Sequence, residues 1–449
     1  MDLGRHHQVD WRALLARRGF RFFFLGIFVS LFGSGMNFAG VTWYILGKTN
    51  STVQVSFMLI LWMIPGLIVP FGGGVLIDRL DRRYLGITVD LLRGFVVGGV
   101  SALLFFNRGG LGAIYFMTVM IGIGSAIYWS NMNALVQEVI PSGQLIAANS
   151  AVLIAVQGGL AISGGFVGFV YNGAGVAGIL AIDAATYFVS ALCLLLLRRG
   201  HVSPRAHPKM ELPAELEAPL AAAEETALPP LIEPTVEPDI GTGFRAELKE
   251  VIAYLRKQPA VLALGLTYSC MIAGVLSGNV LVVALTKDIL HADARGYGLM
   301  ESGWAVGAIT GGLAVGILVR RFSPMAVLLA ALITLAVGHL AFPYATFLAI
   351  GIILHAIFGG CRALGGVLTQ SGIMSLVPRR LMGRTQSAFA VFSTTLQIFI
   401  SFSLGWLAEK VSLPFAFFIL AALYGGAVLA ALRARALAAP ALPAGAVER

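Results

Sequence analysis

The sequence predicts an all-α polytopic membrane protein of twelve transmembrane helices arranged as two six-helix bundles. Hydrophobic residues make up 58% of the 449 residues and charged residues only 12%, about half the charged fraction of an ordinary globular domain. The apolar runs extend for about 20 residues or more, the length that a helix needs to cross a bilayer core. The chain also has 54 glycines, and small residues let membrane helices approach closely.

Apolar runs separated by short polar turns predict the individual spans. In the first bundle, residues 21–197, we expect helices near 21–47, 53–77, 85–106, 111–137, 145–171 and 174–197. In the second bundle, residues 259–432, we expect helices near 259–286, 297–319, 325–342, 346–373, 383–408 and 413–432. An N-terminal segment, residues 1–20, and a C-terminal tail, residues 433–449, flank the bundles.

One long hydrophilic stretch, residues 198–258, connects the two bundles. Its centre, from Pro204 to Gly241, is rich in Pro, Ala and Glu, and such a segment has too few apolar residues to fold, so we expect a disordered linker. Its end, near 243–257, places apolar residues on one helical face and charges on the other. We expect this amphipathic helix to lie along the membrane surface.

The distribution of basic residues predicts the orientation. With both termini and the linker in the cytoplasm, 24 of the 31 basic residues are cytoplasmic and five lie on the opposite side. Arg93 and Arg362 lie within helices. This asymmetry predicts a multi-pass protein of the bacterial inner membrane with cytoplasmic termini. It also accounts for the net charge of +9, so we expect no nucleic-acid partner.

The two halves of the sequence repeat one another. The segment Val139–Pro141 recurs as Leu376–Pro378, 237 residues later. Asn37 and Asn279 are related by a similar offset of 242 residues. Halves related by an axis along the membrane normal are a transporter architecture, with the substrate site near the midplane between them.

The most specific local motif is GGGVLIDRLDRR, residues 72–83, in the turn between the second and third spans. Its spacing of glycine, aspartate and arginines resembles the signature of the major facilitator superfamily. The resemblance implies a charge latch that holds one state of the transporter, with Asp78 at the N-terminus of a helix from the other half. Asp90 and Arg93 can pair at i and i+3, and we assign them to the same latch. The residues assigned to the latch are Gly74, Asp78, Arg79, Arg82, Arg83, Asp90, Arg93 and Glu138.

Four further stretches are similar to one branch of that superfamily, the drug and siderophore exporters related to macrolide efflux pumps and the enterobactin exporter. They are residues 90–93, 141–150, 183–188 and 378–387. The resemblance implies export of a small amphiphilic compound by alternating access and proton antiport. Leu160-Ala161 stand where antiporters often carry Gly-Pro, so a same-fold importer or a lysophospholipid flippase is the alternative. A membrane scaffold or enzyme is a more remote one.

Ionisable residues inside apolar helices are expensive unless they face water or a partner. His355, Arg362 and Thr369 are seven residues apart and share one helical stripe. We predict that this stripe faces the central cavity and binds an anionic or catechol-type substrate, or couples to protons. The alternative for Arg362 is bonding to backbone carbonyls at a helix interface, and His355 is equally open to a packing role.

Other candidates for the substrate or proton pathway are acidic and amide residues. Glu301 is either a proton carrier or an exposed acid near the outer end of its helix. Asp183 is deeper, and a structural hydrogen bond is the alternative to a role in the pathway. The uncharged cavity candidates are Asn37, Tyr128, Asn131, Asn133 and Asn279.

The sequence carries no arrangement typical of an enzyme or a metal protein. Cys193, Cys270 and Cys361 lie in separate apolar segments, without the spacing of a disulfide framework or a metal site. The glycine-rich runs lie within apolar helices, and no nucleotide-binding loop, Ser/His/Asp set or suitable carboxylate pair is evident. We therefore expect a monomeric transporter without cofactor or metal, whose partners are a small-molecule substrate, protons and the lipid bilayer.

Overall fold

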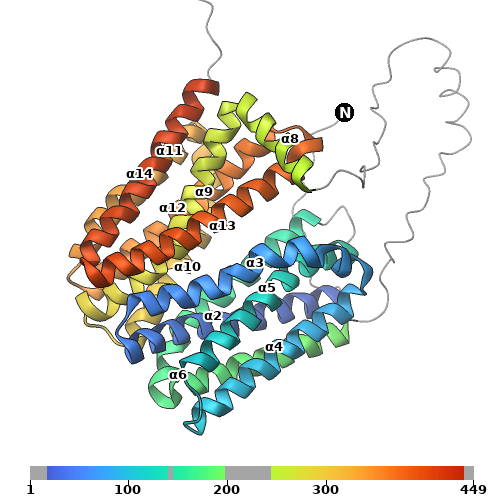
Figure 1. Cartoon of the computed structure of the whole chain (residues 1–449), viewed down its shortest axis with the longest axis vertical. Coiled ribbons are helices and arrows are strands. Elements are labelled where there is room, and N and C mark those ends of the chain that lie inside the picture. Colours follow the sequence, from blue (N-terminus) through green and yellow to red (C-terminus); the bar gives the residue numbers. More distant parts are fainter. Residues whose placement is uncertain (1–17, 140–144, 198–243, 439–449) are drawn as a thin grey trace, which may run out of the picture.

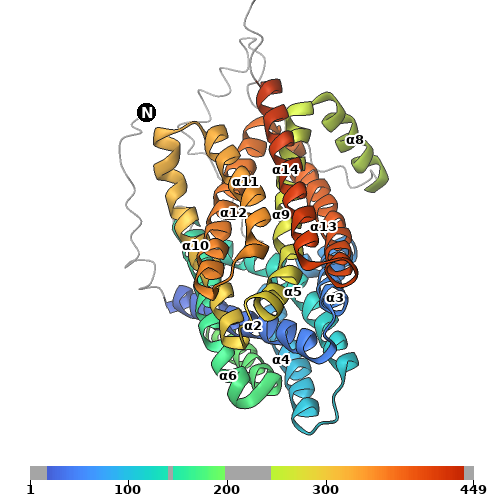
Figure 2. The same ribbon diagram turned by 90° about the vertical axis from the view of Figure 1, so that its left-hand side faces the viewer.

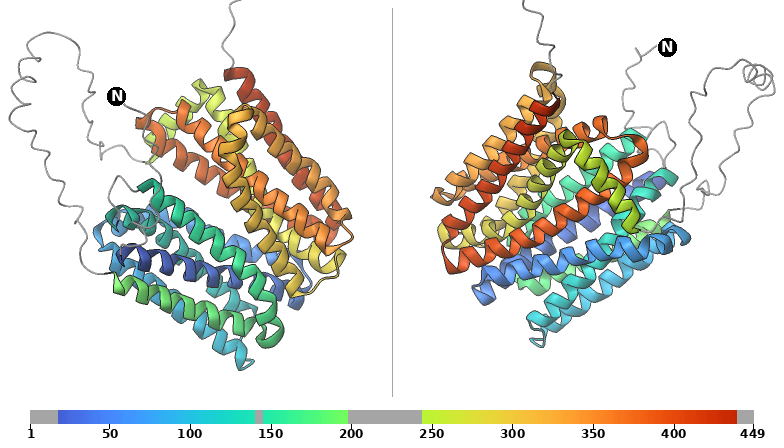
Figure 3. Two further views of the ribbon diagram at one scale, coloured as in Figure 1. Left: turned by 180° about the vertical axis from the view of Figure 1, so that it is seen from behind. Right: turned by 45° about the horizontal axis from the view of Figure 1, so that its top comes forward.

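A computed structural model of the chain describes residues 18–139, 145–197 and 244–438. The central part of the linker, residues 1–17 of the predicted N-terminal segment and residues 439–449 of the predicted C-terminal tail lie outside these ranges. Within them the chain is helical and contains no strand. Figure 3 shows the helices gathered into two bundles, one coloured blue to green and the other yellow to red.

The first bundle contains five long helices. These are α2 (Arg18–Thr49), α3 (Thr52–Arg79), α4 (Arg82–Phe105), α5 (Leu111–Val139) and α6 (Leu145–Leu196). The second bundle contains six: α9 (Pro259–Ala284), α10 (Ala294–Arg321), α11 (Pro324–Ala341), α12 (Leu348–Leu376), α13 (Arg379–Lys410) and α14 (Leu413–Ala438). A π-helical turn, η2 (Leu285–Ile289), extends α9, and a 3-10 turn, η3 (Phe342–Tyr344), follows α11.

Helix α6 crosses the membrane twice. Its 52 residues correspond to about 78 Å of helix at 1.5 Å per residue, more than twice the thickness of a bilayer core. The helix is broken at Gly175, which has φ 63° and ψ −167°, a conformation available to glycine because it has no Cβ. The limbs before and after Gly175 are the fifth and sixth predicted spans. Eleven helices in the described ranges are long and apolar enough to span. Because α6 provides two spans and each of the others provides one, the prediction of twelve spans is confirmed.

Side-chain caps explain where several helices begin. Asp81 accepts hydrogen bonds from the backbone N–H groups of Arg83 (2.9 Å) and Tyr84 (3.2 Å) at the start of α4. Ser323 caps α11, which has Pro324 at its first position. These side chains accept hydrogen bonds from backbone N–H groups that have no partner within the first turn of the helix. Asp81, within the motif of residues 72–83, therefore stabilises the turn as an N-cap.

The two bundles are joined by hydrogen bonds at one end, where α3 and α13 lie side by side (Figure 1). Thr52 Oγ1 donates to the carbonyl of Gly405 at 2.7 Å, and Ser56 Oγ donates to that of Ser401 at 2.7 Å. Lys287 Nζ donates to Asn50 Oδ1 at 2.8 Å. Each spanning helix reverses the direction of the chain, so successive turns lie at opposite ends of the bundles. The turns after α2, η2 and α13 are at the end opposite the linker, and the hydrogen bonds therefore join the bundles at that end.

A second contact between the bundles runs along the first limb of α6 and the start of α10. Asn172 Nδ2 donates to Asp293 Oδ2 at 3.2 Å, and Ser302 Oγ donates to the carbonyl of Ala161 at 2.7 Å. Burial raises the pKa of Asp293, but hydrogen bonds from the Gly296 amide, Asn172 and the Arg295 amide outweigh it and leave the pKa lowered. The carboxylate at this contact is therefore ionised at neutral pH.

The amphipathic helix before the second bundle is α8 (Phe244–Lys257). It contacts α13 and α9, and Figure 2 shows it at the same end of the second bundle as the C-terminal end of α14. Val251 and Leu255 are only 2% and 9% exposed because they pack into the end of the second bundle. An ion pair between Glu250 and Arg384 ties α8 to α13. The apolar face of α8 thus packs on the end of the second bundle, and its position along the membrane surface stays a prediction.

Candidate functional site

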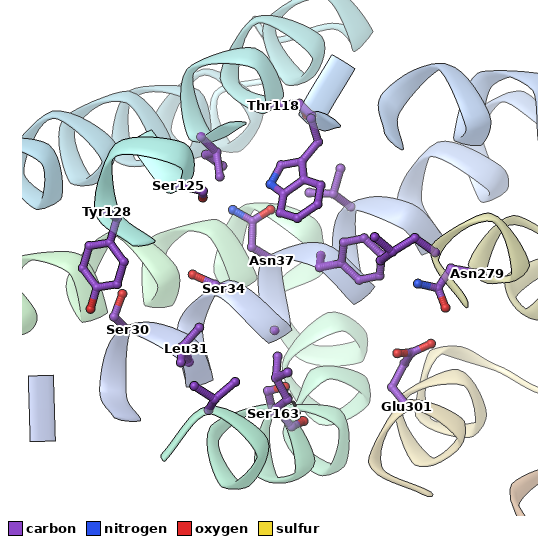
Figure 4. Close-up of a pocket in the computed structure, with 18 of the residues that line it drawn as sticks. Ser30, Leu31, Ser34, Asn37, Thr118, Ser125, Tyr128, Ser163, Asn279 and Glu301 are labelled. Atoms are coloured by element: carbon purple, nitrogen blue, oxygen red, sulfur yellow. Dashed lines mark hydrogen bonds between the residues drawn. The ribbon is translucent and has the colours of Figure 1, made fainter. Parts of the chain in front are cut away.

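A cavity of about 320 Å³ lies between the two bundles. Its wall is built from α2, α3, α4, α5 and α6 of the first bundle and from α9 and α10 of the second (Figure 4). The volume is at the lower end of the range for small-molecule sites. A cavity shared by two repeated halves is where a transporter of this architecture binds its substrate.

Helix α2 presents a polar stripe to this cavity. Ser30, Ser34 and Asn37 all line it, and their spacing of four and three residues places them on one helical face. Ser34 Oγ lies 3.0 Å from Tyr187 Oη, within hydrogen-bond distance. Asn37 Nδ2 donates to Asp183 Oδ2 at 2.6 Å. The stripe therefore connects the cavity to polar side chains on the second limb of α6.

Asp183 is fully buried behind the wall of the cavity. Besides the bond from Asn37, its backbone carbonyl accepts a hydrogen bond of 2.7 Å from Thr186 Oγ1. Gly33 of α2 lies so close that a Cβ there would meet the Asp183 carboxylate at 2.7 Å. The absence of a side chain at Gly33 thus lets α2 and α6 approach closely enough for the Asn37–Asp183 bond to form.

Arg93 is the basic side chain of the cavity wall in the described residues. It is 5% exposed and forms a buried ion pair with Asp90, one turn earlier on α4. Its guanidinium lies over the rings of Tyr128 and Tyr187, 4.5 and 4.4 Å from their centroids. The ion pair and the two ring faces compensate the buried charge. Asp90 and Arg93 thus form part of the central polar network, at a greater depth than the turn that carries the latch motif.

Glu301 and Asn279 bring polar groups from the second bundle into the cavity. Figure 4 shows both side chains on the same side of the cavity, on α10 and α9 respectively. The Oε1 atom of Glu301 is buried and has no hydrogen-bond partner. Trp304 lines the cavity one turn further along α10. The structure therefore places Glu301 at the cavity and not at an exposed outer surface.

Besides Asp183, three candidates from the sequence lie away from the cavity wall that the structure describes. Arg362 lies within α12, near Tyr268 and Tyr424, and its Nε atom has no partner. His355 is 3% exposed and its ring is 5.0 Å from that of Trp304, so it packs behind the cavity. Asn131 Nδ2 donates to the carbonyl of Arg82 at 2.7 Å and so supports the turn between α3 and α4.

The latch motif is only partly described. The side chains of Asp78, Arg79 and Glu138 and the surroundings of Gly74 lie outside the described part of the chain, as does the side chain of the cavity candidate Asn133. Arg83 Nε donates to the carbonyl of Leu194 at 2.8 Å, and Arg83 Nη2 donates to the next carbonyl, Leu195. Arg83 thus caps the C-terminal end of α6, where free carbonyls favour a cation. The latch itself stays a prediction.

Several residues of the cavity were not predicted from the sequence. The aromatic side chains Trp62 and Trp304 line it, as do the small polar side chains Ser125 and Ser163. The stripe of Ser30, Ser34 and Asn37 carried a usable signal, because polar residues at helical spacing in an apolar span mark a polar face. Within the described residues, no three His, Cys, Asp or Glu side chains are grouped to hold a metal ion.

Comparison with known proteins identifies the family. A model of the Major Facilitator Superfamily matches residues 23–401. The enterobactin exporter EntS of Citrobacter koseri is 25% identical over 392 residues, covering 84% of this chain and 82% of that protein. Macrolide efflux protein A of Streptococcus pyogenes is 21% identical over 291 residues, covering 64% of each.

Solved structures show the same fold. The nucleoside transporter NupG superposes with a TM-score of 0.68 at 12% identity, covering 93% of this chain and 98% of that one. A bacterial homologue of the iron transporter ferroportin, in an inward-facing state, superposes with a TM-score of 0.64 at 18% identity, covering 94% and 98%. The predictions of fold, of family and of a transporter rather than an enzyme are confirmed. The chain belongs to the major facilitator superfamily and is a multi-pass membrane transporter.

Proposed function

We propose that this chain exports a small amphiphilic compound from the cytoplasm by alternating access, driven by proton antiport. The observation that carries the proposal is the cavity between the two bundles, which has an aromatic wall and buried acidic groups at or beside it. Aromatic surface suits an apolar substrate body, and a few placed polar groups orient it. The names of the relatives, an exporter and an efflux protein, support the outward direction.

Alternating access requires the bundles to separate at one end and close at the other. The hydrogen bonds from Thr52, Ser56 and Lys287 join the bundles at the end opposite the linker. The distribution of basic residues favours a cytoplasmic linker and termini in the bacterial inner membrane. We propose that the carrier is monomeric and that, with this orientation, the bonds at the periplasmic end hold it in an inward-facing state that takes substrate from the cytoplasm.

Proton coupling needs a buried acid whose surroundings change between states. Asp183 and Glu301 are the candidates, because Asp183 is fully buried on the Asn37 hydrogen bond and Glu301 lines the cavity. The latch of Asp78 and its neighbouring arginines, taken from the superfamily signature, would stabilise the opposite, outward-open state. The latch is expected to break as the cytoplasmic end opens.

Reconstitution tests the proposal directly. The purified protein in proteoliposomes should move a substrate against its gradient when a pH gradient is imposed, and collapse of the gradient should abolish accumulation. Accumulation that ignores the gradient contradicts antiport, whereas movement with the opposite polarity favours the importer. Transfer of lysophospholipid between leaflets in the same vesicles would favour the flippase.

A further inference from the structure

The cavity wall has one charged side chain from each bundle, and only the one from the first bundle has an oppositely charged partner in its own bundle. Apart from tyrosines, Arg93 and Glu301 are the ionisable side chains among the described residues that line it. Arg93 is neutralised within the first bundle by its ion pair with Asp90. Two aromatic rings cover the same guanidinium. An anionic substrate would have to compete with Asp90 for this cation, so Arg93 is a poor anchor for a negative charge.

Glu301 has no cationic side chain among the described residues of the cavity wall to compensate it other than Arg93, which Asp90 already engages. Its Oε1 atom is buried without a hydrogen-bond partner. The polar groups beside it are neutral: the Asn279 amide of the wall on α9 and, one turn earlier on α10, the Tyr297 hydroxyl, which is buried outside the wall and interacts with the Glu301 carboxyl. A buried carboxylate without a cation is costly. Binding of a cation would remove that cost.

The surroundings of Glu301 suit a cation attached to an apolar body. Trp304 lines the cavity on the same helix one turn away, and Phe38, Trp62 and Trp129 line it from the first bundle. Aromatic faces attract cations through their quadrupole and stack on apolar rings. The cavity therefore combines one uncompensated negative group with several large aromatic surfaces.

We propose that the substrates of this transporter are amphiphilic cations, whose positive group binds at Glu301 and whose apolar body packs among the cavity aromatics. This assignment rests on the proposed function and specifies the substrate class. It differs from the anionic or catechol-type substrate expected from Arg362, because that arginine lies away from the described cavity wall. Glu301 is the residue that selects the sign of the charge.

A pair of probes with matched shape and opposite charge tests the proposal. Tetraphenylphosphonium is a permanent cation and tetraphenylborate is the corresponding anion, so neither changes charge with pH. Equilibrium dialysis against the full-length protein in detergent measures the two affinities without any gradient. The variants are Glu301→Gln, which keeps the shape, and Glu301→Asp, which keeps the charge. Asp288→Asn removes one exposed negative charge from η2, away from the cavity, and is the matched control.

We expect the wild-type protein and Asp288→Asn to bind the phosphonium at least about tenfold more tightly than the borate. Glu301→Gln should weaken phosphonium binding by about ten- to a hundredfold, the range for loss of a charge-assisted contact. It should change borate binding less than about twofold, and Glu301→Asp should keep the preference for the cation. The proposal is wrong if the wild type does not bind the phosphonium, or if Glu301→Gln binds it normally or weakens both probes equally. Because no transport is measured, failure of proton antiport in vesicles would leave this result intact.

Discussion

The close crossing of α6 and α10 predicts that a single methyl group will open the closed end of the transporter. Gly164 faces α10 in this crossing, and a Cβ placed there would meet the Ser302 amide nitrogen at 2.7 Å and the carbonyl of Gly298 closer still. Ordinary contacts begin at about 3.4 Å. In Gly164→Ala the two helices must therefore separate by about 1 Å, and they belong to different bundles.

Adding a methyl group to a closely packed contact destabilises it by about 1–3 kcal/mol. That cost applies only to the state in which α6 and α10 touch at this point. The equilibrium should therefore move away from this state by roughly 5- to 150-fold, at 1.4 kcal/mol per tenfold. Gly165→Ala is the matched control, because its Cβ would lie 4.0 Å from Ser302 Oγ, an ordinary contact. Any gain in helix propensity is the same in both variants.

Electron–electron distance measurements can detect the shift. With the three native cysteines replaced, spin labels at Arg108 and Tyr344 report on the closed end from two exposed turns, one in each bundle. Gly164→Ala should add or enlarge a population at longer distance, and Gly165→Ala should match the parent protein. Identical distance distributions for the two variants would show that the Gly164 contact does not limit closure.

Three further predictions concern the charged residues. Asp78→Asn should leave membrane insertion intact but reduce transport in vesicles, and wild-type flux would remove the latch. Arg93→Met should lower the free energy of unfolding by about 3–5 kcal/mol because it leaves Asp90 buried without its partner, whereas the double variant with Asp90→Asn should recover most of the loss. Purely additive losses in mixed-micelle unfolding would show that the pair is not coupled. Arg362→Ala should lower the transport of acidic and neutral substrates equally. A selective loss for acidic substrates would show that Arg362 binds substrate in the cavity.

The spans were predictable because the bilayer imposes a length and a composition on each of them. The bend at Gly175 is an example in which the polar turn NGAG marked the break between two spans that the structure joins in one helix. The contact of α8 with the second bundle was harder to foresee. An amphipathic face with Val251 and Leu255 packs equally well on lipid headgroups or on protein, and the pattern of residues does not distinguish the two.

The composition of the site was less predictable than the spans, because rotation of a helix about its axis decides which residues face the cavity. Arg362 and Glu301 both lie within apolar runs, and only the packing of α10 and α12 separates them. The pairing of Asp90 with Arg93 follows from their spacing. The rings of Tyr128 and Tyr187 that complete the environment of Arg93 come from α5 and α6, and their approach depends on the tertiary fold.

The two repeated halves contribute differently to the site. The first bundle supplies most of the polar wall, from Ser34 and Asn37 to Arg93, but its charges are satisfied within that bundle through Asp90 and Asp183. A bundle whose buried charged side chains each have a partner within it can move as a rigid body without exposing a new unpaired charge. Glu301, on the other bundle, has no cationic side chain to pair with among the described residues of the cavity wall except Arg93, which Asp90 already engages. A substrate that binds Glu301 while its body rests on the first bundle would contact both halves, and its binding energy could then depend on their relative position, which is what coupling a cargo to alternating access requires.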